Sequence, residues 1–152
     1  MSESLNDTLE NTRQWFEIAV PNPTSKNIST QIGCHLEEVE EMLQTIYPNG
    51  SYDAELLQRA QDAITNLANH MKRKVDAYRI DVSTELLDAL ADQIVTATGV
   101  GTFLGMNVPG ALAEVNRSNY SKFNAEGEPI FNENMKVMKG PFYTKPDLTP
   151  YI

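Results

Sequence analysis

Apolar residues recur at helical spacing in segments that proline and glycine separate, and this pattern restricts the chain to a helical fold. One segment, from Thr24 to about Tyr47, has an apolar face made of Ile32, Leu36, Val39, Leu43 and Ile46. Pro21 and Pro23 must end the segment before it, because proline has no amide hydrogen to donate within a helix. Pro48-Asn49-Gly50 ends the segment itself.

The same signals predict five helices. Their expected bounds are residues 5–19, about 25–47, 53 to about 78, 84 to about 104, and 108–121. Residues 128–138 could form a small hairpin, and residues 139–146 should be extended. We therefore expect an all-α fold, a bundle of four or five helices, with residues 1–123 as the helical domain and 124–152 as a C-terminal arm.

Charge and composition narrow the class of ligand. The chain has 152 residues, 41% of them hydrophobic, which is enough for a buried core. Its net charge of −9 argues against binding to duplex nucleic acid or an anionic membrane, but permits a small anion whose charge metal ions neutralise. No apolar run is long enough to span a bilayer, and the acidic N-terminus does not resemble a signal peptide. Cys34 is the only cysteine, so we expect no internal disulfide and a cytoplasmic protein.

The first acidic cluster is the run Glu37-Glu38-Val39-Glu40-Glu41 in the second predicted helix. Because a helix turns by about 100° per residue, Glu37, Glu38 and Glu41 share one arc of its surface. Glu40 points to the other side of the polar face. These carboxylates could bind a metal ion, or they could form an ordinary solvated helix face.

The second acidic cluster is Asp88 and Asp92, four residues apart on one face of the fourth predicted helix. That helix is apolar around its whole circumference, which predicts that it is buried. Burial of an unpaired carboxylate costs several kcal/mol, and residues 80–116 contain no lysine or arginine. A divalent ion, Mg²⁺ or Mn²⁺, would compensate this cost. A cation from another helix, such as Arg79 or Arg117, is the alternative.

The acidic run resembles the E-E-x-x-E motif of the MazG-like all-α nucleoside triphosphate pyrophosphohydrolases. Asp92 resembles the aspartate of that superfamily's later E-x-x-D motif, because Leu104-Gly105-Met106-Asn107 follows it at the family's spacing. The resemblance covers about residues 24–123. Ala89 stands where the family has a glutamate, and Asp88 could replace that carboxylate. The whole chain looks most like the short MazG-like proteins of bacteriophages, whose MazZ branch acts on (d)GTP.

This resemblance implies hydrolysis of a (d)NTP, (d)GTP if the chain belongs to the MazZ branch, between the α- and β-phosphates, which yields a monophosphate and pyrophosphate. Mg²⁺ or Mn²⁺ would be held by Glu38, Glu41, Asp88 and Asp92. Glu37, or whichever of Glu37 and Glu38 does not bind the ion, would act as general base. The residues expected to contact the triphosphate are Asn116, Asn119, Lys122, Lys139 and Lys145. The setting would be the host-cell cytoplasm if the protein is phage-encoded.

Recognition of the base is a weaker prediction. Trp15 could stack on it while Asn27 or Gln31 contacts its edge, although an aromatic pair such as Trp15 and Phe16 on a short amphipathic helix is more often core or subunit interface. We expect a homodimer or homotetramer, both because relatives in the superfamily assemble and because five short helices can scarcely cover the fourth. The alternative function is a non-catalytic interaction module whose acidic face binds a basic partner. We expect no catalytic role for Cys34 or for either histidine.

Overall fold

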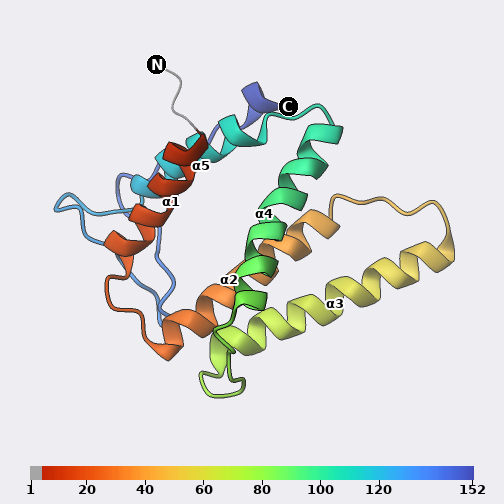
Figure 1. The fold of residues 1–152 in the computed structure, drawn as a ribbon, viewed down its shortest axis with the longest axis horizontal. Coiled ribbons are helices and arrows are strands. Elements are labelled where there is room, and N and C mark those ends of the chain that lie inside the picture. The colour runs from red at the N-terminus through yellow and green to blue at the C-terminus, as the bar shows by residue number, and fades with distance from the viewer. Residues whose placement is uncertain (1–4) are drawn as a thin grey trace. The chain divides into compact units, whose positions relative to one another are not determined.

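The computed structural model describes residues 5–152, and its regular structure over that range is helical throughout (Figure 1). The prediction of an all-α fold is confirmed, and the described residues contain no β-strand. The elements are α1 (Leu5–Ala19), α2 (Ser25–Leu43), α3 (Ser51–Arg73), α4 (Thr84–Phe103), α5 (Val108–Tyr120) and a short 3₁₀ turn, η1 (Thr149–Tyr151).

Side chains cap the starts of α2 and α4. The Thr24 hydroxyl accepts the amide N–H of Asn27, and the Asn27 carboxamide oxygen accepts the amide N–H of Thr24, so both residues cap α2. The Ser83 hydroxyl caps α4 by accepting the amide N–H of Leu86. Helix ends were predicted less well. α3 stops at Arg73, five residues before the predicted end, because Lys74 adopts an extended backbone where the sequence has neither proline nor glycine.

Contacts group the chain into two units. Unit 1 comprises residues 1–21, 80–130 and 137–152, and unit 2 comprises residues 22–79 and 131–136. This grouping does not follow the expected division at residue 123, which stays a prediction. Among residues 5–152, no helix has the length and apolar character needed to cross a membrane.

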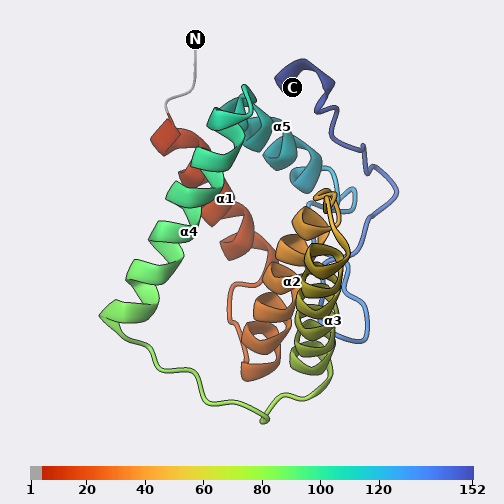
Figure 2. The same cartoon turned by 90° about the vertical axis from the view of Figure 1, so that its right-hand side faces the viewer.

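In unit 2, α2 and α3 lie side by side and pack closely around Gly33 (Figure 2). A β-carbon at Gly33 would lie 2.6 Å from Cγ of Lys72 and 2.7 Å from the carbonyl oxygen of Ala68, closer than atoms normally approach. Beside this contact, the Ser29 hydroxyl donates to the carbonyl oxygen of Met71 and the Lys26 ammonium donates to that of Lys72. The absence of a side chain at Gly33 therefore sets how close the two helices come.

Residues 131–136 also belong to unit 2 and form a tight turn in place of a regular hairpin strand. The Asn132 carboxamide oxygen accepts the amide N–H groups of Asn134 and Lys136, and Met135 has the left-handed backbone that closes the turn, with φ of 62°. The Thr30 hydroxyl of α2 donates to the carbonyl oxygen of Asn134 at 2.7 Å. The turn is thus fastened to α2 just before Lys136.

In unit 1, α1 packs against α5. Trp15 is 6% exposed and stacks on Phe123 with a ring centroid distance of 5.7 Å; Ala19 completes this small core. Asn116 of α5 is also buried, and its carboxamide accepts the Thr12 hydroxyl and donates to the carbonyl oxygen of Thr8. These bonds satisfy both ends of a buried amide and join the two helices.

The last part of the C-terminal arm, residues 139–152, runs antiparallel to α5 within unit 1 (Figure 2). Near the end of α5, the Ser118 hydroxyl donates to the carbonyl oxygen of Thr144 at 2.8 Å. Glu114 accepts the amide N–H of Asp147, and the amide N–H of Asn107 donates to the carbonyl oxygen of Tyr151. The arm is therefore bound along the helix of its own chain, and residues 139–146 are non-helical as predicted.

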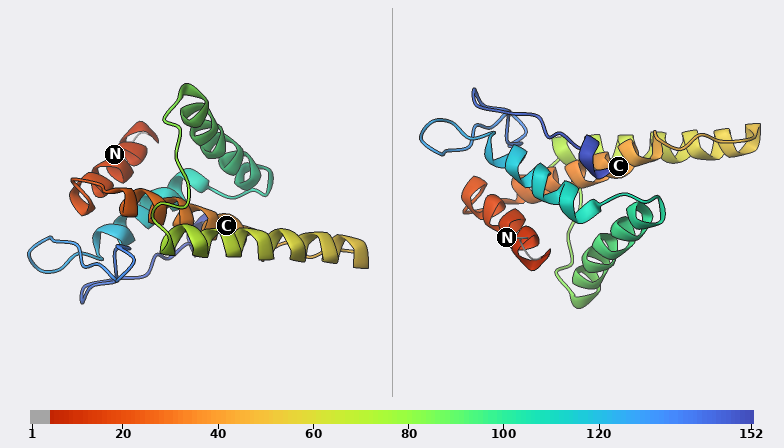
Figure 3. Two further views of the ribbon diagram at one scale, coloured as in Figure 1. Left: turned by 90° about the horizontal axis from the view of Figure 1, so that it is seen from below. Right: turned by 90° about the horizontal axis from the view of Figure 1, so that it is seen from above.

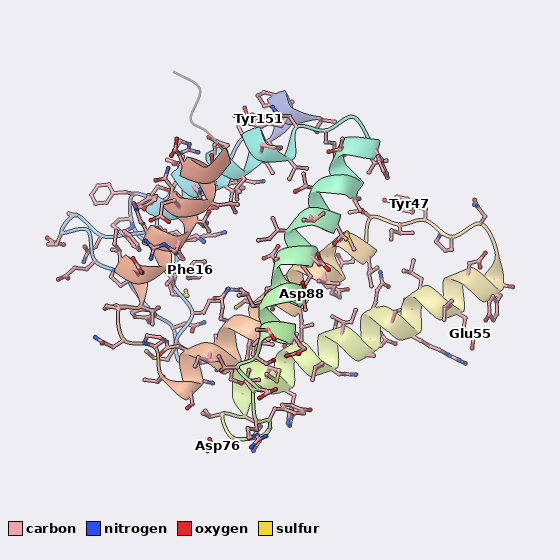
Figure 4. The ribbon with its side chains drawn as sticks, in the orientation of Figure 1. Phe16, Tyr47, Glu55, Asp76, Asp88 and Tyr151 are labelled. Atoms are coloured by element: carbon pink, nitrogen blue, oxygen red, sulfur yellow. The ribbon has the colours of Figure 1, made fainter. Side chains whose placement is uncertain are left out.

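The prediction that α4 is buried is wrong for the single chain. Leu87, Val95 and Phe103 are 68%, 66% and 92% exposed. In unit 1 only α5 packs against α4, and the two helices diverge from the loop that joins them (Figure 3). Asp88 is accordingly an exposed side chain on α4 (Figure 4).

Two glycine substitutions test the packing of α2 against α3. Gly33→Ala should lower the free energy of unfolding by about 1–3 kcal/mol, because its methyl group would overlap backbone as well as the Lys72 side chain. Gly99→Ala is the matched control: it lies in α4 with open space around its Cα, so better helix propensity should raise stability by about 0.5–1 kcal/mol. Urea denaturation followed by circular dichroism measures both. A Gly33→Ala protein as stable as the parent would contradict the packing described for unit 2.

Candidate functional site

A groove of about 510 Å³ lies between α2 and α3 in unit 2. From α2 it is lined by three carboxylate side chains, those of Glu37, Glu40 and Glu41, and Gln44 and Thr45 line it just after the helix ends. From α3 it is lined by Thr65, Ala68 and Asn69. Polar oxygen atoms therefore line a groove whose geometry follows from the close contact of the helices at Gly33.

Glu37 lies at the centre of a charged cluster in this unit. One carboxylate oxygen pairs with the ammonium group of Lys72, and the other lies 3.4 Å from that of Lys136. Partial burial raises the pKa of Glu37, but the hydrogen bond from Lys72 and the charges of both lysines outweigh it and hold the pKa below its ordinary value. A lowered pKa makes Glu37 a weaker proton acceptor, which disfavours it as the general base.

The other glutamates of the run face different surroundings. Both carboxylate oxygens of Glu40 accept hydrogen bonds from the Gln44 side-chain amide, at 2.9 and 2.8 Å. Glu41 is exposed and lines the groove, and Glu38 is exposed outside the groove lining. Of the two predicted glutamate ligands, only Glu41 therefore lines the groove.

The donor set of the groove suits a hard cation, because carboxylate and amide oxygens are the ligands that Mg²⁺ prefers. Within residues 5–152, however, there is no group of three or more histidine, cysteine, aspartate or glutamate side chains close enough together to hold an ion. The groove thus supplies suitable ligands without a formed coordination sphere.

Asp88 and Asp92 lie on α4 in unit 1, exposed and one turn apart. Their exposure removes the argument that burial forces a metal ion on them, because a solvated carboxylate needs no compensating charge. The assignment of Asp88 and Asp92 as metal ligands therefore rests only on their resemblance to the family motif.

Two of the three residues predicted to recognise the base, Trp15 and Asn27, have structural roles. Trp15 is a core residue whose ring is stacked on Phe123, as the alternative prediction held. Asn27 is buried as part of the α2 capping box, and Gln31 is exposed on α2. The Trp15 indole N–H and the Asn27 amide nitrogen have no hydrogen-bond acceptor among the described residues. Trp15 belongs to unit 1, whereas Asn27 and Gln31 belong to unit 2.

The residues predicted to bind the triphosphate all lie in unit 1, on or near α5 and the arm. The Asn116 amide is fully used in joining α1 to α5. The Lys122 ammonium lies 5.7 Å from the centre of the Trp15 ring, and that of Lys139 lies 4.8 Å from the centre of the Tyr143 ring, both cation–π contacts. Asn119 is half-buried, and Lys145 is exposed with its carbonyl oxygen bound to Arg117.

Cys34 and His70 lie outside the groove lining. Burial is the main cause that raises the pKa of the Cys34 thiol, and a raised pKa disfavours the reactive thiolate. His70 is exposed near the end of α3, and its ring packs edge-on against Tyr78.

Lys72 and Lys136 were not predicted as site residues. Lys136 falls within residues 128–138, where the sequence suggests a small hairpin. One signal for α3 was available in the sequence: Thr65, Asn69 and Lys72 recur at intervals of four and three residues and so share a helix face. No sequence signal links Lys136 to Glu37, because 99 residues separate them.

In comparisons with known proteins, no protein-family model, curated protein or solved structure matches this chain. The resemblance to MazG-like enzymes therefore depends on the short motifs alone.

The ion pairs of Glu37 predict a pH-dependent contribution to stability. Because its pKa is lower in the folded state than the ordinary 4.5, the contribution is complete above pH 4.5 and is lost as the pH falls through the folded value. Glu37→Gln should therefore cost about 1 kcal/mol at pH 7, and this difference from the parent should vanish on acidification. Glu55→Gln, which removes an exposed pair with Arg59, is the control and should cost a few tenths of a kcal/mol. A Glu37→Gln cost that does not change between pH 7 and pH 3 would contradict the ion-pair account.

Proposed function

We propose that this protein is a metal-dependent nucleoside triphosphate pyrophosphohydrolase of the MazG-like type. It would cleave a (d)NTP, (d)GTP if the chain belongs to the MazZ branch, between the α- and β-phosphates to give a monophosphate and pyrophosphate. The observation that carries the proposal is the groove between α2 and α3, in which Glu37, Glu40 and Glu41 of the motif helix meet polar side chains of α3. Oxygen-rich surroundings of this kind suit Mg²⁺ or Mn²⁺.

The proposal assigns roles to the acidic residues. Glu41 would hold the ion at the groove, with Glu38 of the same helix as its partner ligand. The motif further assigns Asp88 and Asp92 to metal binding. A bound divalent ion would neutralise phosphate charge and lower the pKa of an attacking water. Glu38 is the better candidate for general base when it does not bind the ion, because the lysines around Glu37 lower the pKa of that carboxylate.

A homodimer or homotetramer is also part of the proposal. Its support is the exposed apolar surface of α4, where Leu87, Val95 and Phe103 are largely in contact with solvent in the single chain. Soluble proteins rarely leave a large continuous apolar surface uncovered. Light scattering should give a mass of two or four times 17.0 kDa, and a mass of 17.0 kDa would contradict the proposed assembly.

The activity is tested by incubating the purified protein with each ribo- and deoxyribonucleoside triphosphate, in Mg²⁺, Mn²⁺ or EDTA, and separating the products by ion exchange. We expect metal-dependent release of monophosphate and pyrophosphate. Glu41→Gln and Asp92→Asn should each lower kcat/KM by about a hundredfold or more, because each removes a proposed metal ligand. Glu126→Gln, an exposed residue outside the groove lining, should keep parental activity.

Three outcomes would count against the proposal. Release of diphosphate and orthophosphate would contradict the bond assigned to cleavage. Parental activity in Asp92→Asn would remove that residue from the metal site. No turnover of any nucleotide, with or without metal, would favour the acidic interaction module.

A further inference from the structure

The cluster around Glu37 brings two lysines together within a strongly acidic chain. Two ammonium groups, from Lys72 and Lys136, converge on one carboxylate. The Lys72 side chain is 12% exposed and that of Lys136 is 50% exposed, so one cation is deep in the cluster and the other faces solvent. Two cations therefore meet at one carboxylate, and the neighbouring Glu38 adds its own negative charge near Lys136.

This cluster adjoins the groove. Glu37 lines it, and on α3 the lining residues Ala68 and Asn69 precede Lys72 by one helical turn. The groove therefore has carboxylates along its α2 wall, at Glu40 and Glu41, and two lysines beside its Glu37 end. Carboxylates alone would repel a polyphosphate, whereas lysines alone would not attract a metal ion. The combination is complementary to a polyphosphate carrying a divalent ion.

The fold holds both lysines in place by contacts other than the ion pairs. Gly33 leaves room for the Lys72 stem against α2, and Lys26 binds the Lys72 carbonyl oxygen. The Asn132 side chain accepts the Lys136 amide N–H, and Thr30 fastens the same turn to α2. Partial burial lowers the pKa of Lys136, but neighbouring groups, the Glu37 carboxylate among them, hold that pKa above its ordinary value, so the ammonium group stays protonated at neutral pH.

We propose that Lys72 and Lys136 form an anion-binding subsite for the phosphate chain of the ligand, and that the Glu37 carboxylate occupies this subsite until phosphate oxygens replace it. This inference deepens the proposed function and rests on it for the identity of the ligand. It transfers phosphate recognition to unit 2 and to two residues outside the predicted set of lysines and asparagines. The preorganised ammonium groups would then exchange one anionic partner for another.

The test is binding of inorganic triphosphate to the full chain, measured by titration calorimetry in EDTA and in Mg²⁺. Lys136→Gln removes the half-exposed cation without opening the core, and should weaken binding about tenfold, the usual loss for one charge-assisted hydrogen bond. Lys74→Gln is the matched control: it makes the same charge change on an exposed side chain of unit 2 and should stay within about twofold of the parent. Glu37→Gln should tighten binding in EDTA, because no carboxylate then competes for the lysines.

Three results would overturn the subsite: parental affinity in Lys136→Gln, equal losses in Lys136→Gln and Lys74→Gln, or no binding of triphosphate by the parent protein. Failure of the proposed function gives a different pattern. If no nucleotide is hydrolysed but triphosphate binding still depends on Lys136, the anion subsite stands without the enzyme. If nucleotides are hydrolysed while Lys136→Gln binds triphosphate like the parent, the enzyme stands without the subsite.

Discussion

The close contact of α2 with α3 at Gly33 is the constraint on which the candidate site depends. Because position 33 has no side chain, the Lys72 stem lies against α2 and its ammonium group reaches Glu37. The same contact places the α3 residues Thr65 and Asn69 opposite the acidic run of α2. A larger residue at position 33 would separate the helices, and both the groove and its lysine cluster would lose their geometry.

Local signals in the sequence were sufficient for most of the fold. The period of the apolar residues gave five helices, and Thr24 and Ser83 cap helices as their chemistry suggests. The end of α3 was missed because Lys74 leaves the helix without proline or glycine. The cation partners of Glu37 were missed for a different reason: Lys136 reaches it across 99 residues, through a turn organised by Asn132, and helical periodicity carries no information about such a contact.

The apolar circumference of α4 led to the wrong prediction that this helix is buried within the single chain. An apolar circumference indicates that a helix needs cover, but does not say whether its own chain supplies that cover. In the single chain Leu87 and Phe103 are exposed, so the predicted cost of burying Asp88 and Asp92 does not arise there. Conversely, Trp15 and Asn116, predicted to contact substrate, are the side chains that join α1 to the C-terminal half of unit 1. Large aromatic and amide groups serve packing as readily as recognition.

The central claim is that the groove between α2 and α3 binds a divalent ion together with phosphate. Titration of Mn²⁺ into the ¹⁵N-labelled protein tests it most directly, because the paramagnetic ion broadens the amide signals of nearby residues. With inorganic triphosphate present, the account predicts that signals from residues 37–45 and 65–72 broaden first and that Lys136 follows. Broadening that begins elsewhere, or that is uniform along the chain, would contradict it.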